Sequence, residues 1–169
     1  YGAEVTLERS FQNDYYFMMT GSLYQSSYTA LDGVERDSRY DAGYAANFLF
    51  GKEFKFGDEK NNTIGLNTKV SLLGGNRYTP IDLQASQDAG YTILQNKPYA
   101  SKGDDIFFIN LGVTYRLDKP RASHSIKIDI QNLTNNKAAV NEYYNSRTGQ
   151  IEKSTQLSFI PNLVYTIKF

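Results

Sequence analysis

The segment FFINLGVTYRL, residues 107–117, decides the fold class, because its apolar side chains recur at every second position. The odd-numbered positions are all apolar: Phe107, Ile109, Leu111, Val113, Tyr115 and Leu117. The even-numbered positions that follow Phe108 are small or polar, and they end in Thr114 and Arg116. Such alternation predicts a β-strand with one apolar face. The segment also has the length, about 9–11 residues, with which a tilted strand crosses a bilayer.

The same alternation of apolar and polar residues recurs elsewhere in the chain. The other segments are 1–8, 15–25, 45–56, 64–72, 125–131 and 162–169. Together they predict an all-β, antiparallel, up-and-down β-barrel architecture with about seven strands, and they indicate no convincing helix. In the segment 45–56, Lys52 interrupts an apolar face formed by phenylalanines. We interpret it as a side chain that keeps its stem on the apolar surface and its ammonium in water.

Composition excludes several classes of site. The chain has 169 residues, 18 basic and 18 acidic side chains, no cysteine and one histidine, His124. Disulfides, thiolate metal sites and histidine metal clusters are therefore excluded, and no net charge attracts nucleic acid. His124 is expected beside a short turn, without the partners of a catalytic constellation. We predict no enzyme activity, no cofactor, no metal and no nucleic-acid partner.

The predicted connections alternate in length. They fall at 10–14, 28–43, 57–62, 75–105, 118–123 and 135–157, in the order short, long, short, long, short, long. Outer-membrane barrels have short turns on one side and long loops on the other. Soluble β-meanders mostly use short connections throughout. A soluble, lipocalin-like barrel, which has its apolar face inside, is therefore the less favoured alternative.

Aromatic and charged residues support a membrane barrel. Tyr and Phe gather near both ends of the predicted strands, as they do at the two interfaces of a bilayer. The polar faces mix charges of both signs with small residues, which suits a water-filled or plugged lumen. The charged and amide side chains of these faces are Glu4, Glu8, Asn47, Glu53, Lys55, Asn67, Lys69, Asn110, Arg116, Lys127 and Asp129.

The sequence ends in NLVYTIKF, residues 162–169, with an aromatic last residue. Leu163, Tyr165, Ile167 and Phe169 alternate with Asn162, Thr166 and Lys168. The pattern resembles the C-terminal signal by which barrel-assembly machinery recognises outer-membrane proteins. We therefore predict that Leu163, Tyr165, Ile167 and Phe169 form such a signal. The alternative is an ordinary terminal strand.

Two further segments have distinctive motifs. The first is GGNRYTPIDL at 74–83, with the pattern Gly-Gly-x-Arg-Tyr-Thr-Pro-Ile-Asp. The second is QNLTNNKAAV at 131–140, which contains an Asn-Leu-Thr-Asn segment at Asn132, Leu133, Thr134 and Asn135. Both resemble the C-terminal barrel region of TonB-dependent receptors, in the group with an N-terminal carboxypeptidase-regulatory-like domain.

The resemblance implies a barrel of about 22 strands with a plug inside it. Residues 1–169 would be its C-terminal portion, and the plug and TonB-contact segment would lie outside this chain. The function implied is TonB-energised import of a scarce nutrient, such as an iron chelate, glycan or peptide, across the outer membrane of a Gram-negative bacterium. The implied partners are outer-membrane lipid, the rest of the barrel, its plug and the TonB complex. Some relatives have a surface lipoprotein over the barrel, and the sequence leaves open whether this one does.

Arg77, Tyr78 and Asp82 begin the longest predicted loop. They are candidates for ligand contact from the extracellular side, and the alternative is that they only shape the loop. The alternative function is that of a stand-alone small outer-membrane barrel with a structural or adhesive role. In a barrel of about eight strands, side chains fill the interior and leave no path for a nutrient.

Overall fold

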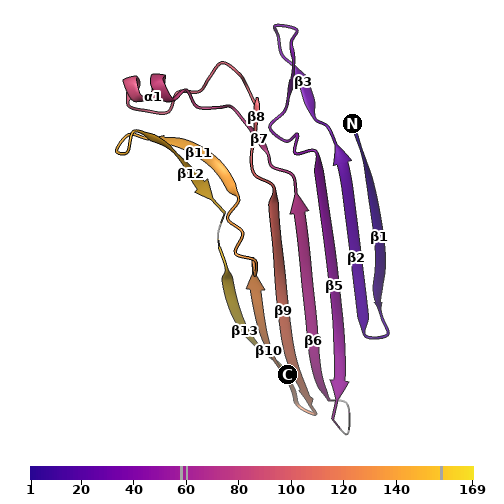
Figure 1. Ribbon diagram of the computed structural model, residues 1–169. Helices are drawn as coiled ribbons and strands as arrows, with labels where there is room; N and C mark the ends of the chain where they lie inside the picture. Colours follow the sequence, from indigo (N-terminus) through magenta and orange to yellow (C-terminus); the bar gives the residue numbers. More distant parts are fainter. Residues whose placement is uncertain (58, 60, 157) are drawn as a thin grey trace.

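The computed structural model describes residues 1–57, 59, 61–156 and 158–169, and its dominant feature is one antiparallel sheet of seven long strands (Figure 1). The strands lie side by side in chain order, each paired with the next one along the sheet. They are β1 (Gly2–Gln12), β2 (Tyr15–Tyr24), β5 (Tyr44–Phe56), β6 (Asn62–Leu73), β9 (Ile106–Lys119), β10 (Ala122–Gln131) and β13 (Ile160–Lys168). The prediction of an all-β, antiparallel fold is confirmed.

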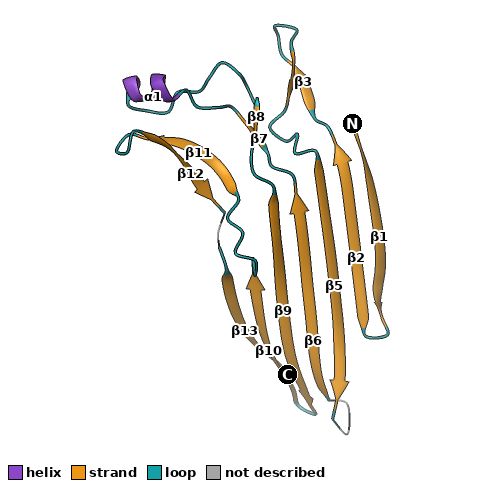
Figure 2. Cartoon of the chain, viewed as in Figure 1, coloured by secondary structure: helices purple, strands orange, loops and turns teal. Residues whose placement is uncertain are grey.

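The long connections contain further secondary structure, all at one end of the sheet (Figure 2). Among the residues that the structure describes, three small two-stranded sheets are formed there. Their strands are β3 (Ser27–Thr29) with β4 (Glu35–Asp37), β7 (Arg77–Tyr78) with β8 (Ser101–Lys102), and β11 (Ala139–Asn145) with β12 (Gln150–Thr155). Strands of two or three residues are too short to show alternation, which is why the sequence did not reveal β3, β4, β7 and β8.

The expectation of no helix is wrong at one place, since α1 spans Leu83–Ala89. The Asp82 carboxylate caps its first turn by accepting a hydrogen bond from the backbone N–H of Ala85, and Gly90 ends it with φ 78°. Seven residues are too few for a helical period to be recognised, but the cap and the final glycine were readable signals. Among the described residues, no helix is long and apolar enough to cross a membrane.

Two of the turns at the other end are short, as predicted. Only Asn13 and Asp14 separate β1 from β2, and both have positive φ (54° and 64°). Pro120 and Arg121 separate β9 from β10. The predicted turn at 57–62 includes Asp58 and Lys60, and the predicted loop at 135–157 includes Leu157, and these three residues lie outside the described residues.

Register keeps the apolar side chains on one face of the whole sheet. Leu7 pairs with Met19, Met19 with Phe48, Phe48 with Val70, and Val70 with Ile109. A second row continues to the last strand, from Leu66 through Val113 and Ile128 to Leu163. Because side chains alternate across a strand, this register leaves Thr, Asn, Ser and charged residues on the opposite face.

The apolar face is the exposed one. Val5, Leu23 and Leu163 are 70%, 69% and 74% exposed. In the central strands the buried residues belong to the polar face instead, namely Gly51, Thr63, Gly65, Ser71 and Gly112. Tyr16, on the polar face, contributes to this crowding, because it lies over Gly51 and donates a hydrogen bond to the Asn67 side chain at 3.0 Å.

The few buried apolar side chains of the described residues are found in the loops. They are Ala42, Ile81 and Ala138, with 3–6% exposure. Within the described residues, neither face of the sheet therefore has an apolar core. Burial of large apolar side chains, which stabilises soluble domains, is absent from the described part of the sheet.

Candidate functional site

The segment 74–82 begins with two glycines because the backbone of two other loops passes directly over them. A Cβ on Gly74 would clash with the carbonyl oxygen of Ala42, and a Cβ on Gly75 would clash with that of Gly103. Glycine is required at such close approaches of backbone to backbone. The two glycines therefore allow the loop after β2 and the segment before β9 to pack directly on the end of β6.

Arg77 connects two long loops. Its Nε donates to Asp41 and another guanidinium nitrogen to Asp37, both at 2.9 Å. Asp41 is buried, with 7% exposure, and also accepts a hydrogen bond from the backbone N–H of Ser26 at 3.0 Å. That backbone bond, together with Arg77, holds the pKa of the Asp41 carboxyl below its usual range. The guanidinium is thus largely committed to protein carboxylates.

Tyr78 and Asp82 have different environments. The Tyr78 hydroxyl donates to Glu142 of β11 at 3.3 Å. Burial, followed by the Glu142 carboxylate, raises the pKa of the Tyr78 phenol. The Asp82 carboxylate accepts a hydrogen bond from the backbone N–H of Ala85 in α1. The Asp82 carbonyl accepts one from the hydroxyl of Ser86, which is fully buried. The structure brings Arg77 and Tyr78 to one cavity, whereas Asp82 caps α1 and does not line that cavity.

That cavity lies between the loop 74–105 and the β11–β12 hairpin, and its volume is about 470 Å³. It combines basic, acidic, amide and aromatic side chains. Its lining includes Arg39, Asn76, Arg77, Tyr78, Leu94, Tyr99, Lys102, Asp104, Asn141, Glu142 and Lys153. A cavity with convergent polar groups of both signs can bind a polar ligand through several directed hydrogen bonds.

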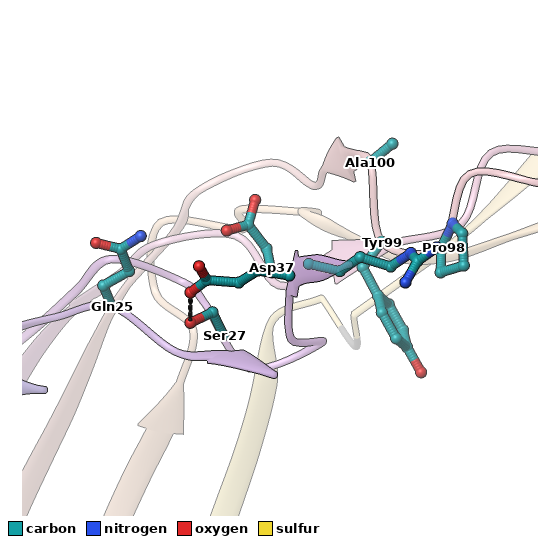
Figure 3. Close-up of a pocket in the computed structure, with 8 residues that line it drawn as sticks. Gln25, Ser27, Asp37, Pro98, Tyr99 and Ala100 are labelled. Carbon is teal, nitrogen blue, oxygen red and sulfur yellow. Dashed lines mark hydrogen bonds between the residues drawn. The ribbon is translucent and has the colours of Figure 1, made fainter. Parts of the chain in front are cut away.

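A second cavity of about 380 Å³ lies beside the first, between the β3–β4 hairpin and residues 98–100 (Figure 3). Gln25, Ser27 and Asp37 line it, and the Ser27 hydroxyl donates to Glu35 at 2.6 Å. Tyr99 lines both cavities and has a left-handed backbone with φ 55°. Its ring packs edge-on against Tyr28, with centroids 6.3 Å apart.

Sequence reasoning missed most of this lining. Tyr99, Lys102, Glu142 and Lys153 lie in three separate parts of the chain, and none belongs to a recognisable motif. The left-handed backbone of Tyr99 costs about 1–2 kcal/mol, and residues other than glycine rarely adopt it, so the sequence does not indicate it. The only sequence signal was the abundance of Tyr, Asn, Asp and Arg in the long loops.

The segment 132–135 ends β10 with a tight turn. Asn132 and Asn135 have positive φ (51° and 52°), and the Asn132 side chain accepts hydrogen bonds from Thr134 and from the backbone of Asn136, both at 3.1 Å. The backbone N–H of Leu133 donates to Ile109 of β9 at 2.7 Å. These contacts indicate a structural role for the segment, because asparagine tolerates the left-handed conformation and bonds its own backbone.

The residues of the predicted assembly signal lie on the last strand and just beyond it. Leu163, Tyr165 and Ile167 share the apolar face of β13, opposite Ile128, Ile126 and His124. The Tyr165 hydroxyl lies 2.8 Å from Nδ1 of His124, and Phe169 is 98% exposed. Recognition by assembly machinery remains a prediction.

No three His, Cys, Asp or Glu side chains in the described part of the chain form a group that could hold a metal ion. No protein-family model, curated protein or solved structure matches this chain.

Proposed function

We propose that this chain is part of the wall of an outer-membrane β-barrel that imports a scarce nutrient with energy from TonB. Within that proposal the polar face lines the lumen, and the loops 25–43, 74–105 and 132–159 form the outer vestibule. The family resemblance of residues 74–83 and 131–140 supports the transporter class. The architecture supports a membrane location independently of it.

The observation that carries the proposal is the inverted polarity of the sheet. Thr63 and Ser71 are 3% and 1% exposed on the polar face, whereas Phe48, Leu66 and Ile128 are 38–48% exposed on the apolar face. The crowded face of a curved sheet is its concave face, because side chains converge there. A soluble barrel would have the opposite arrangement. Transfer of an exposed Leu or Phe side chain from water to an apolar environment contributes roughly 1.5–3 kcal/mol.

The edges of the sheet support a barrel larger than the seven strands. Among the described residues, β1 and β13 each pair on one side only. Unpaired backbone groups cost several kcal/mol each in the bilayer core. We infer that further strands of the same barrel pair with both edges, as they would in a barrel of about 22 strands.

The cavities support a receptor for polar ligands. Both lie among the long loops, at the end of the sheet away from the short turns. Loops supported by a rigid sheet are common places for binding residues. The cavities are consistent with capture of a polar nutrient above the lumen, and they do not distinguish an iron chelate from a glycan or a peptide.

The test is the size and location of the native gene product. An antibody to residues 144–149 would be used on membrane fractions of the source cell. We expect a band several times larger than 19.2 kDa in the outer-membrane fraction. A band near 19 kDa would contradict the transporter and favour a stand-alone structural or adhesive barrel. A competition between wild-type and deletion strains on limiting nutrients, with and without TonB, then tests import.

A further inference from the structure

The charged side chains on the apolar face of the sheet are all basic. Within the described residues of the seven strands, this face carries Arg9, Lys52 and Lys119, and no carboxylate. The strand carboxylates lie on the opposite face: Glu4, Glu8, Glu53, Asp118 and Asp129. The chain as a whole has equal numbers of acidic and basic residues. The separation is therefore a property of the two faces and not of the composition.

Two of these residues neighbour Tyr15, next to the β1–β2 turn. The Arg9 guanidinium stacks 4.1 Å from the centre of the Tyr15 ring. Tyr15 is the register partner of Lys52, whose ammonium lies 5.3 Å from the Phe54 ring. Arg9 and Lys52 lie two strands apart and are offset by two residues along the strands, which separates their backbones by about 12 Å.

Both cations have unused hydrogen-bonding capacity. The Arg9 Nε–H is buried and has no hydrogen-bond partner within the described residues. Lys52 makes no ion pair with any residue that the structure describes, whereas Lys55 and Lys127 on the polar face each meet a carboxylate. The Arg9 guanidinium donates one long hydrogen bond, to the Gln12 carbonyl at 3.5 Å. Its remaining terminal N–H groups and the Lys52 ammonium are donors that an anion can use.

From this arrangement we propose that Arg9, Tyr15 and Lys52 form a binding site for the anionic phosphodiester headgroup of a glycerophospholipid. The proposal rests on the membrane location proposed above. The guanidinium binds phosphate oxygens through its fork of donors, and the ammonium adds a second charge. The acyl chains then extend over Leu7, Met19 and Phe48, which follow on the same face. The site holds a lipid of the leaflet that meets the short turns.

The position on the sheet agrees with this chemistry. Aromatic side chains anchor barrels at the membrane interface, and basic side chains near it attract anionic lipid. Tyr15 is the first residue after the β1–β2 turn, so this level of the sheet is where headgroups would lie. Free phosphate shares the headgroup's chemistry but not its acyl chains, so the two can be separated by experiment.

The experiment uses the full-length protein in detergent and native mass spectrometry. Three probes are titrated: phosphatidylglycerol, diacylglycerol without a phosphate, and inorganic phosphate. We expect retained phosphatidylglycerol with wild type, and affinity lowered at least about tenfold by Arg9→Gln with Lys52→Gln, since two charge-assisted hydrogen bonds are lost. The control, Lys69→Gln with Lys127→Gln, removes the same charge from the polar face and leaves binding unchanged. Arg9→Lys with Lys52→Arg keeps the charge and retains part of the binding.

Equal loss of lipid in the control pair would overturn the site, because net charge alone would then explain binding. Equal binding of diacylglycerol would show that the headgroup is not recognised, and binding of inorganic phosphate as tight as that of the lipid would show that the lipid is not. Either result sinks the proposal. Each variant is first shown to fold by its electrophoretic shift on heating. A protein absent from the outer-membrane fraction would instead contradict the proposed function.

Discussion

Arg77 and Asp41, 36 residues apart in sequence, form a 2.9 Å ion pair that connects the loop after β2 to the loop after β6. Asp37 meets the same guanidinium, and the backbone N–H of Arg77 donates to the carbonyl of Arg39 at 3.0 Å. Arg77 lines the larger cavity, and its other carboxylate partner, Asp37, lines the smaller one. The ion pair therefore holds in place the loops that form them.

Replacement of Arg77 should loosen these loops. Arg77→Met leaves the buried Asp41 carboxylate without its cationic partner, at a cost of about 1–3 kcal/mol. We expect faster protease cleavage within 25–43 and 74–105, with the sheet intact. Arg147→Met, at the exposed β11–β12 turn, is the matched control. It should leave the rate of cleavage within 25–43 and 74–105 at the wild-type value. A cleavage rate unchanged by Arg77→Met would show that the ion pair does not hold the loops.

The same contact should depend on pH in one direction. The folded-state pKa of Asp41 lies below the usual 3.8, because Ser26 and Arg77 favour its charged form. Its contribution to stability is therefore complete above about pH 3.8–4 and is lost as the pH falls through the lower folded value. Hydrogen exchange of the Ser26 amide, corrected for its intrinsic rate, should accelerate on acidification. Asp41→Asn should abolish that dependence, and persistence of the dependence in this variant would assign it to another group.

The glycine pair gives a steric prediction. Gly75→Ala places a Cβ against the Gly103 carbonyl, and we expect destabilisation of about 1–3 kcal/mol from overpacking. Gly21→Ala in β2 is the control, because a Cβ there meets nothing within 4 Å. Thermal unfolding of the two variants compares them directly. Equal melting temperatures would mean that the loop can move aside without cost.

The last strand gives a prediction about assembly. If barrel-assembly machinery recognises this strand, Phe169→Ser and Tyr165→Ser should each lower the amount of folded protein in the outer membrane. Phe159→Ser removes an exposed aromatic residue just before β13 and should leave that amount unchanged. Blots of membrane fractions with and without heating measure the folded fraction. Normal assembly of both C-terminal variants would leave β13 an ordinary strand.

The two ends of the sheet should lie on opposite sides of the membrane. A cysteine at Ser146, in the β11–β12 turn, should react with an impermeant maleimide on intact cells. A cysteine at Arg121, in the β9–β10 turn, should react only after the outer membrane is opened. The chain has no native cysteine, so the background is low. The reverse pattern of labelling would invert the proposed orientation.

The strands were predictable because their signal is local. Alternation in residues such as Phe107–Leu117 reports which face each side chain takes, and no distant contact is needed to read it. Predicted boundaries differed from the observed ones by a few residues: β10 begins at Ala122 and not at Ser125, and β1 continues to Gln12. Backbone pairing with the neighbouring strand extends each of these strands beyond the residues whose side chains alternate.

The candidate site was predictable only in part. The motif at 74–83 contains Arg77 and Tyr78, both of which line the larger cavity, and Asp82, which caps α1. Glu142 and Lys153 reach the same cavity from a hairpin more than sixty residues further along the chain. Nothing in their local sequence indicates that position.

By itself, the sequence determined the seven strands, the two kinds of face and the alternation of short and long connections, since all three are encoded within a few neighbouring residues. Tertiary structure alone decided which face is crowded, which loops meet and which charges find partners. Lys52 shows the difference. The sequence marked it as a charge on an apolar face, but only strand register placed it opposite Tyr15 and near Arg9. Contacts between distant segments depend on register and loop closure, which no local pattern records.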